Sequence, residues 1–298
     1  MTFSIAHSLD DALNALAEGA RPIAGGTDLV VGSRQGKGSL PSRLIAIDRI
    51  SELATITRGA ESTSIGAGVT HSRLMIDDIV VEDFTAIADA AALVGSPSTR
   101  NVGTIGGNVM NGSPAMDTGA PLVVLGAMAE LTTSSGSRTV SLDELWIAPG
   151  ETSAAPTELC TALVLPNPAA SSGSAYVRLE YRRAMEIAIV GAAAAVELDG
   201  DNVSSVRVAL TAVAPTIIEV TGLDALEGSA ADDDLLDAIA AAASEQAVPI
   251  SDLRASDRYR RHTVGVMARR AADAAIRRAR GEVIAVPVNR ALGVGAAS

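Results

Sequence analysis

The stretch of residues 103–117 constrains this chain more than any other part of its sequence. It contains the adjacent glycines Gly106 and Gly107, with hydroxyl and amide side chains around them and little bulk. Glycine allows positive φ and a close main-chain approach, and successive free N–H groups in a tight turn form a concave anion site. The stretch is therefore predicted to hold its backbone against a ligand that carries a phosphate or pyrophosphate.

A second stretch of the same kind lies upstream, at residues 22–29, where Gly25 and Gly26 precede Thr27. Glycine pairs most often mark ordinary turns, and neither stretch has the Gly-Lys-Ser/Thr ending or the strict G-x-G-x-x-G spacing of a phosphate motif. Taken alone, the upstream pair is better explained as a turn. The two stretches together predict one extended ligand that is held at two places.

Charge and cysteine content exclude several classes of protein. The chain has 298 residues, a net charge of −12 and a pI near 4.7, which argues against nucleic acid or an anionic membrane as a partner. Its single cysteine, Cys160, permits no internal disulfide and cannot ligate an iron–sulfur cluster. The N-terminus lacks the pattern of a signal peptide, and no run of about 20 apolar residues occurs, so a cytoplasmic protein without membrane insertion is expected.

The first part of the chain reads as a small α/β unit that ends near residue 57. Ser8 is expected to cap a helix that stops at Gly19, because apolar residues recur at helical spacing between them. Short strands are predicted at 21–24 and 43–48, and the second is apolar enough to be buried on both faces.

A larger unit is predicted from residue 58 to 172. Asp83 is expected to cap a helix that Pro97 ends. After the glycine stretch the pattern predicts a buried helix at 120–125 and strands at 127–132 and 159–165.

The composition changes at residues 169–174, which are rich in Ala, Ser and Gly, and this change marks a second boundary. Beyond it three strands are predicted, at 175–182, 187–198 and 203–212, followed by helices at 232–243 and about 264–280. Strands followed by helices indicate an α+β lobe.

Four segments resemble one known family in their order and spacing, across essentially the whole chain. They are residues 24–29, residues 100–108, Ser113-Pro114 with Asp117, and residues 181–188. These segments are similar to the FAD-binding medium subunit of molybdenum hydroxylases, the xanthine dehydrogenase and carbon monoxide dehydrogenase group.

The resemblance implies an α+β fold with two α/β FAD-binding subdomains of the vanillyl-alcohol-oxidase (PCMH) type. A C-terminal α+β lobe with a three-stranded antiparallel sheet and helices would follow. The expected boundaries are 1–57 and 58–172 for the subdomains, 173–285 for the lobe and 286–298 for a tail.

The same resemblance implies an electron-transfer subunit. A partner subunit with [2Fe-2S] clusters would deliver electrons, and FAD on this chain would pass them to NAD⁺ or another acceptor. A large subunit carrying the molybdopterin cofactor would hydroxylate a small substrate, N-heteroaromatic or purine-like by the form of the 24–28 loop. The expected assembly is a dimer of heterotrimers, and the single cysteine agrees with clusters on another chain.

Residue roles follow from the resemblance. The upstream loop would wrap the FAD pyrophosphate, and the second stretch would hold its other side. Asp117 would bond cofactor hydroxyls, or alternatively cap a helix, and Arg178 would lie near the pyrimidine edge of the flavin, or alternatively form a surface salt bridge. The expected contacts are Pro22, Ile23, Ala24, Gly25, Gly26, Thr27, Asp28, Leu29, Thr104, Ile105, Gly106, Gly107, Asn108, Asp117 and Arg178.

No catalytic residue or metal ligand is predicted on this chain. His7, His71 and His262 lack ligand-spaced partners, so surface or capping roles are expected for them. Cys160 is expected to be an inert core residue. Arg183 is expected to form a surface salt bridge.

Two other functions remain open from the sequence. One is a self-contained FAD oxidase or reductase of the same fold, although histidines and aromatic residues are scarce. The other is a non-catalytic nucleotide-binding module.

Overall fold

The computed structural model describes residues 1–36, 38–182 and 184–294. Contacts divide the chain into two compact units. The first unit comprises Met1–Arg73, Pro97–Gly112 and Ala127–Pro166, and the second comprises Leu74–Ser96, Ser113–Gly126 and Asn167–Ser298. The subdomain boundaries expected from the sequence stay a prediction, and residues 295–298 of the expected tail lie outside the described residues.

A three-stranded parallel sheet opens the first unit. Its strands are β1 (Thr2–Ile5), β2 (Arg21–Ile23) and β3 (Arg43–Ala46), in the order β1-β3-β2. Helix α1 (Leu9–Ala17) begins at Ser8, whose hydroxyl accepts from the N–H of Asp11 while the Asp11 carboxylate accepts from Ser8. This capping box and the buried Leu13 and Leu16 confirm the predicted helix.

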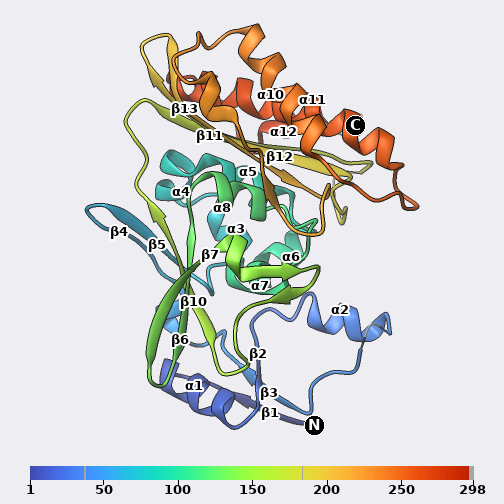
Figure 1. Cartoon of the computed structure of the whole chain (residues 1–298). Coiled ribbons are helices and arrows are strands. Elements are labelled where there is room, and N and C mark those ends of the chain that lie inside the picture. The colour runs from blue at the N-terminus through green and yellow to red at the C-terminus, as the bar shows by residue number, and fades with distance from the viewer. Residues whose placement is uncertain (37, 183, 295–298) are drawn as a thin grey trace. The chain divides into compact units, whose positions relative to one another are not determined.

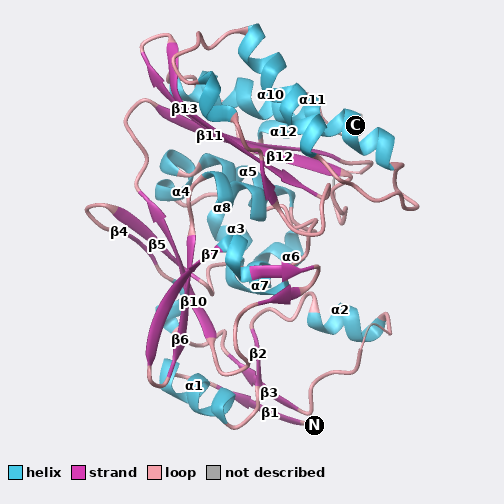
Figure 2. Cartoon of the chain, viewed as in Figure 1, coloured by secondary structure: helices cyan, strands magenta, loops and turns pink. Residues whose placement is uncertain are grey.

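A five-stranded sheet forms the rest of the framework of the first unit, in the order β4-β5-β10-β6-β7 (Figure 2). Its members are β4 (Ile56–Arg58), β5 (Ser62–Gly66), β6 (Met128–Thr133), β7 (Gly136–Ser141) and β10 (Leu159–Pro166). The central strand β10 pairs antiparallel with β5 and β6. Cys160 lies in β10, and burial, with a smaller effect of Glu130, raises its pKa to about 12. The expectation of a buried thiol is confirmed.

Short elements complete the first unit. They are α2 (Leu29–Arg34), η1 (Ser51–Ala54), α6 (Pro97–Val102), α7 (Ile105–Asn111), α9 (Leu142–Leu145), β8 (Trp146–Ala148) and β9 (Glu151–Thr152), with α3 (His71–Leu74) at its border. The indole of Trp146 donates to the carbonyl oxygen of Val109 at 2.9 Å, which holds the last turn of α7.

The second unit is built on a four-stranded antiparallel sheet, β11-β12-β13-β14. The strands are β11 (Ser172–Leu179), β12 (Val190–Asp199), β13 (Asn202–Thr211) and β14 (Ile218–Glu219). The expected three-stranded sheet was therefore wrong by one strand. The missed strand has two residues, which is too short to show an alternating pattern.

Helices cover both faces of this sheet (Figure 1). The elements are α4 (Asp78–Asp83), α5 (Thr85–Leu93), α8 (Gly119–Val124), η2 (Leu223–Leu226), α10 (Asp233–Gln246), α11 (Asp257–Ala279) and α12 (Val288–Ala291). Helix α11 packs on β11 and β12, and α5 and α8 pack against β11 and β13. Val177 enters the core cluster with α11, while its neighbours Tyr176 and Arg178 are buried on the opposite face.

Two helix limits differ from those expected from the sequence. Asp83 is the last residue of α4, and Phe84 precedes α5, so no carboxylate caps that helix. Helix α5 ends at Leu93, and Pro97 begins α6 instead of ending a helix. Proline is well tolerated in the first turn because the N–H that it lacks would have no helical partner there.

A buried ion pair connects the elements of the second unit. Arg278 Nη1 and Nη2 donate to the two carboxylate oxygens of Asp89, at 2.6 and 3.1 Å, and the N–H of Val288 donates to the same group at 2.8 Å. Asp89 is fully buried, and burial raises its pKa while the hydrogen bond from Arg278 opposes that rise. The pair joins α5 to α11 and to the segment that enters α12.

Replacing Asp89 with alanine leaves the Arg278 guanidinium buried without its counter-charge. The expected loss in the free energy of unfolding is about 3–5 kcal/mol, measured by equilibrium urea denaturation. Arg269→Ala is the control, because Arg269 pairs with the exposed Asp233 and Asp237 and should cost less than about 1 kcal/mol. Equal losses in the two variants would contradict this account.

Candidate functional site

The two glycine stretches meet inside the first unit. A Cβ on Gly25 would overlap the carbonyl of Val102 and lie 3.0 Å from the N of Gly103. A Cβ on Gly103 would lie 3.6 Å from the hydroxyl oxygen of Thr27. The backbones therefore touch at a point where side chains would not fit. The sequence predicted a close approach of a ligand to this backbone, and that approach stays a prediction.

The upstream loop, which we define as residues 24–27, presents a row of unpaired donors. Gly26 has a φ of +68°, a conformation that favours glycine. Within the part of the chain that the structure describes, the N–H groups of residues 24 to 27 donate to no acceptor, and all four residues are partly exposed. Successive free amides of this kind suit a phosphate oxygen. The loop fits the diphosphate of FAD.

The second stretch is built differently from what was expected. Thr104 caps α7, and its hydroxyl oxygen accepts from the N–H of Gly107 at 3.1 Å. The N–H groups of Ile105, Gly106 and Asn108 donate to the carbonyls of Val69, Ala67 and Thr104. The prediction of free backbone donors was therefore wrong for Ile105 to Asn108.

Close packing explains the glycine at position 106. A Cβ there would overlap Ala67, with its Cα 2.9 Å away. Glycine thus lets the first turn of α7 lie against the end of β5. Gly107 is exposed, so its Cα leaves a ligand unobstructed. Contacts from residues 104–108 to a cofactor stay a prediction.

His71 lies at the junction of the two stretches, where the sequence suggested a surface or capping role. It is 2% exposed, so the expectation of an exposed residue was wrong. Its N–H donates to the carbonyl of Gly103 at 3.0 Å, and its Cδ2 would be 3.4 Å from a Cβ on Gly103. Burial, and then the charge of Arg100, lower its pKa to about 4. A lone histidine carries no sequence signal that separates this position from a surface one.

Asp117 and Arg178 form a buried charge cluster in the second unit. Arg178 Nη1 donates to Asp117 at 2.7 Å, and Nε donates to Glu180 at 2.7 Å. The hydroxyl of Tyr176 donates to the other oxygen of Asp117 at 2.9 Å. Burial alone would lower the pKa of Arg178, but the charges of Asp117 and Glu180 outweigh burial and raise it.

This cluster excludes the helix cap for Asp117 and the surface salt bridge for Arg178, while their contacts with a cofactor stay predictions. Thr118, not Asp117, precedes α8, and the Arg178 side chain is 0% exposed, which excludes a surface salt bridge. The two carboxylates already occupy the guanidinium, so a contact of Arg178 with the flavin stays a prediction. Arg183, also expected at the surface, lies outside the described residues.

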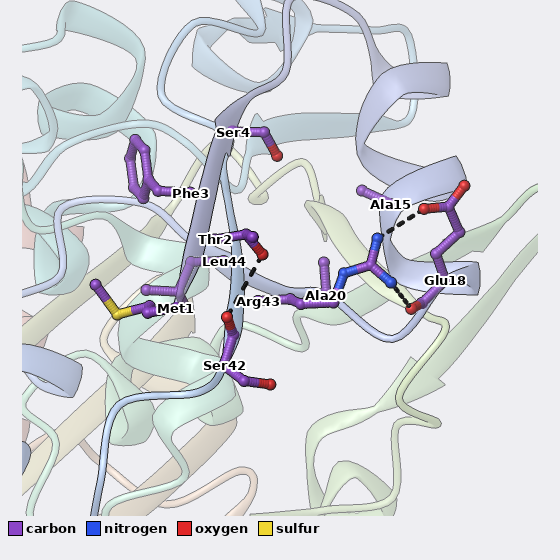
Figure 3. A pocket seen from close by; sticks show the side chains of 10 residues that line it. All are labelled: Met1, Thr2, Phe3, Ser4, Ala15, Glu18, Ala20, Ser42, Arg43 and Leu44. Carbon is purple, nitrogen blue, oxygen red and sulfur yellow. Dashed lines mark hydrogen bonds and ion pairs between the residues drawn. The ribbon is translucent and has the colours of Figure 1, made fainter.

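An open hollow lies at the edge of the three-stranded sheet of the first unit (Figure 3). Arg43 crosses it and donates from Nη1 to the carbonyl of Glu18 and from Nη2 to its carboxylate, at 2.6 and 2.7 Å. None of its lining residues belongs to the predicted cofactor contacts.

Gly25→Ala is expected to destabilise the first unit, because the added methyl group overlaps the backbone of Val102. A loss of about 1–3 kcal/mol in the free energy of unfolding is expected from overpacking of this kind. Gly32→Ala is the control: its Cβ would meet nothing within 4 Å, and alanine favours helix α2 by up to about 1 kcal/mol. Urea denaturation of both variants measures the difference, and a neutral Gly25→Ala would argue against the contact.

The lowered pKa of His71 predicts a pH dependence of stability. Between the ordinary pKa of 6.5 and the folded value of about 4, the unfolded chain binds a proton that the folded chain excludes. The free energy of unfolding therefore keeps its full value above pH 6.5. It falls as the pH drops from 6.5 towards 4, by up to about 1.4 kcal/mol per pH unit. His71→Leu should remove this slope from urea denaturation curves collected between pH 7.5 and 4.5. An unchanged slope would contradict the lowered pKa of His71.

Comparison with known proteins identifies the family. Residues 1–168 match the family described as "FAD binding domain in molybdopterin dehydrogenase", and residues 175–275 match "CO dehydrogenase flavoprotein C-terminal domain". The chain is 30% identical to the xanthine dehydrogenase FAD-binding subunit of Escherichia coli O157:H7, over 93% of this chain and 97% of that protein.

Two further relatives agree. The carbon monoxide dehydrogenase medium chain of Afipia carboxidovorans is 34% identical, over 90% of this chain and 93% of its own length. The structure resembles a chain of reconstituted CO dehydrogenase from Oligotropha carboxidovorans with a TM-score of 0.88 and 32% identity, over 93% of this chain and 98% of that one. This chain belongs to the family of FAD-binding medium subunits of the molybdopterin-dependent hydroxylases.

Proposed function

We propose that this chain holds FAD through the 24–27 loop and transfers electrons from an iron–sulfur partner to NAD⁺ or another acceptor. The observation that carries the proposal is the row of unpaired backbone donors on that loop, set against the second glycine stretch. Donors fixed in place before the ligand arrives bind an anion without further ordering of the chain.

The residues of the loop have distinct parts in this proposal. The N–H groups of Ala24, Gly25, Gly26 and Thr27 would hold the diphosphate, and the Thr27 hydroxyl would add a further donor. The exposed Gly107 would allow a close approach from the second stretch. When bound, FAD supplies the centre that is reduced and reoxidised, and the chain supplies its binding and orientation. A contact from Asp117 stays a prediction.

The proposed partners come from the family resemblance, and the cysteine content agrees with them. A single cysteine cannot ligate a [2Fe-2S] cluster, so the clusters would belong to a small partner subunit. A large partner subunit would carry the molybdopterin cofactor, and the assembly would be a dimer of heterotrimers. The names of the relatives as a subunit and as a medium chain support this arrangement.

The substrate proposed for the large subunit is a small N-heteroaromatic or purine-like molecule. The form of residues 24–28 supports this choice, and one relative is named for xanthine. Another is named for carbon monoxide, so turnover of the assembled complex with xanthine and with carbon monoxide separates the two classes.

The proposal predicts uptake of about one FAD per chain. The experiment is reconstitution of the purified chain with FAD, followed by gel filtration and measurement of flavin absorbance. Emission from Trp146, the only tryptophan, gives a second signal, because a bound flavin accepts energy from an excited indole. A chain that binds ADP but no flavin would instead be a nucleotide-binding module, and turnover of a substrate by the isolated chain would indicate a self-contained oxidase.

A further inference from the structure

Two adjoining loops of the second unit expose large apolar side chains. The first loop joins β11 to β12, and the second joins α10 to α11. The hydroxyl of Tyr181 in the first loop donates to the carbonyl of Arg254 in the second at 2.6 Å, which places the loops side by side. The apolar patch, as we define it, consists of side chains from these loops that are more than half exposed: Tyr181, Met185, Ile187, Ile250 and Leu253.

The turn that carries Leu253 is fixed by hydrogen bonds. Asp252 Oδ1 accepts from the N–H of Arg254 at 2.8 Å and from Nη2 of Arg260 at 2.7 Å. Arg260 is buried on α11, so these bonds tie the turn to the helix, and yet Leu253 is fully exposed. A fixed turn that holds an apolar side chain in water is well suited to bury it against another surface, because little conformational freedom is lost on binding.

Positive charge lies beside the patch, although the chain as a whole is acidic. Residues 248–262 contain four arginines and two aspartates, whereas the net charge of the chain is −12. Arg258 and Arg261 are exposed at the start of α11, and Arg182 is exposed in the loop between β11 and β12. Arginine and tyrosine next to an apolar centre are typical of protein–protein interfaces. The complementary surface is apolar at its centre and acidic at its rim.

These charges also bear on which partner covers the patch. In a two-fold contact between copies of this chain the same residues would face each other, so Arg258 and Arg261 would meet like charges. A second copy is therefore disfavoured. The iron–sulfur subunit of the proposed complex is favoured instead, because the partner that delivers electrons has to touch this chain.

We propose that the apolar patch is the docking surface for an acidic face of the iron–sulfur subunit. Leu253 is the apolar anchor of this contact, and Arg258 is the charge at its rim that pairs with carboxylates of the partner. The inference rests on the proposed function and adds to it the surface through which the electron donor is held.

Binding of the full chain to the separately purified iron–sulfur subunit tests this surface. Leu253→Ser removes the anchor, and Val283→Ser is its matched control, because Val283 is almost fully exposed but follows the far end of α11. Arg258→Glu reverses the rim charge. Its control is Arg270→Glu, since Arg270 is exposed about 18 Å further along the same helix. Affinities are measured by titration calorimetry at about 50 mM and about 500 mM NaCl.

We expect Leu253→Ser to bind the iron–sulfur subunit about 10- to 100-fold more weakly, and Val283→Ser to stay within about twofold of the wild type. Arg258→Glu should weaken binding about tenfold at low salt and much less at high salt, because salt screens exposed charges. Arg270→Glu should change it less than about twofold at either salt concentration. FAD uptake should be the same in all four variants.

Equal affinities of Leu253→Ser and Val283→Ser would overturn the inference. Loss of binding to the large subunit instead of the iron–sulfur subunit would also overturn it, as would self-association of the wild type that Leu253→Ser abolishes. A carboxylate in the first turn favours a helix, so Arg258→Glu keeps α11 intact and decides the matter if Leu253→Ser does not fold. A wild type that takes up no FAD counts against the proposed function, whereas docking of the variants like that of the wild type counts against this surface alone.

Discussion

The contact between the backbone of Gly25 and that of Val102 and Gly103 is the constraint on which the candidate site depends. It fixes two segments that are far apart in the sequence, and it leaves no space for a side chain between them. The donors of residues 24–27 stay unpaired because the chain turns away at Gly26 before it enters α2. A loop held in this way has little conformational freedom to lose when an anion binds, which favours affinity.

Buried ion pairs in the second unit determine how its strands and helices pack. Arg178 is paired with Asp117 and Glu180, and Arg278 is paired with Asp89. All five side chains are almost fully buried. Such pairs contribute little net stability compared with apolar residues, but losing one partner is costly, so they restrict the ways in which the strands and helices can pack. Their positions on β11, α5 and α11 explain why polar residues occur within otherwise apolar elements.

The sequence predicted the family, the mixed fold and most elements, because these depend on local patterns and on several motifs in order. The capping residue Ser8 and the apolar spacing after it are local signals, and α1 forms where they predicted a helix. Strand β14 was missed because its two residues carry no periodicity. The prediction that Pro97 ends a helix was wrong, because proline can also begin one, as it does in α6.

The sequence singled out the glycines of the candidate site but not their neighbours in the structure. Gly106 was predicted to let a ligand approach, and the structure places Ala67 against it. The partners of the amides at residues 105–108 come from β5 and the turn after it, which the sequence could not place. Burial of His71 and of Arg178 likewise depends on tertiary packing that no spacing pattern records.

The interleaving of the two units has a consequence for how this gene can be divided. The second unit takes α4, α5 and α8 from stretches that lie between pieces of the first. A fragment that began at Asn167 would keep the whole four-stranded sheet but lose Asp89, and Arg278 would then have to enter the interior alone. No single cut of the chain yields either unit intact, because each unit is made of three segments that alternate with those of the other.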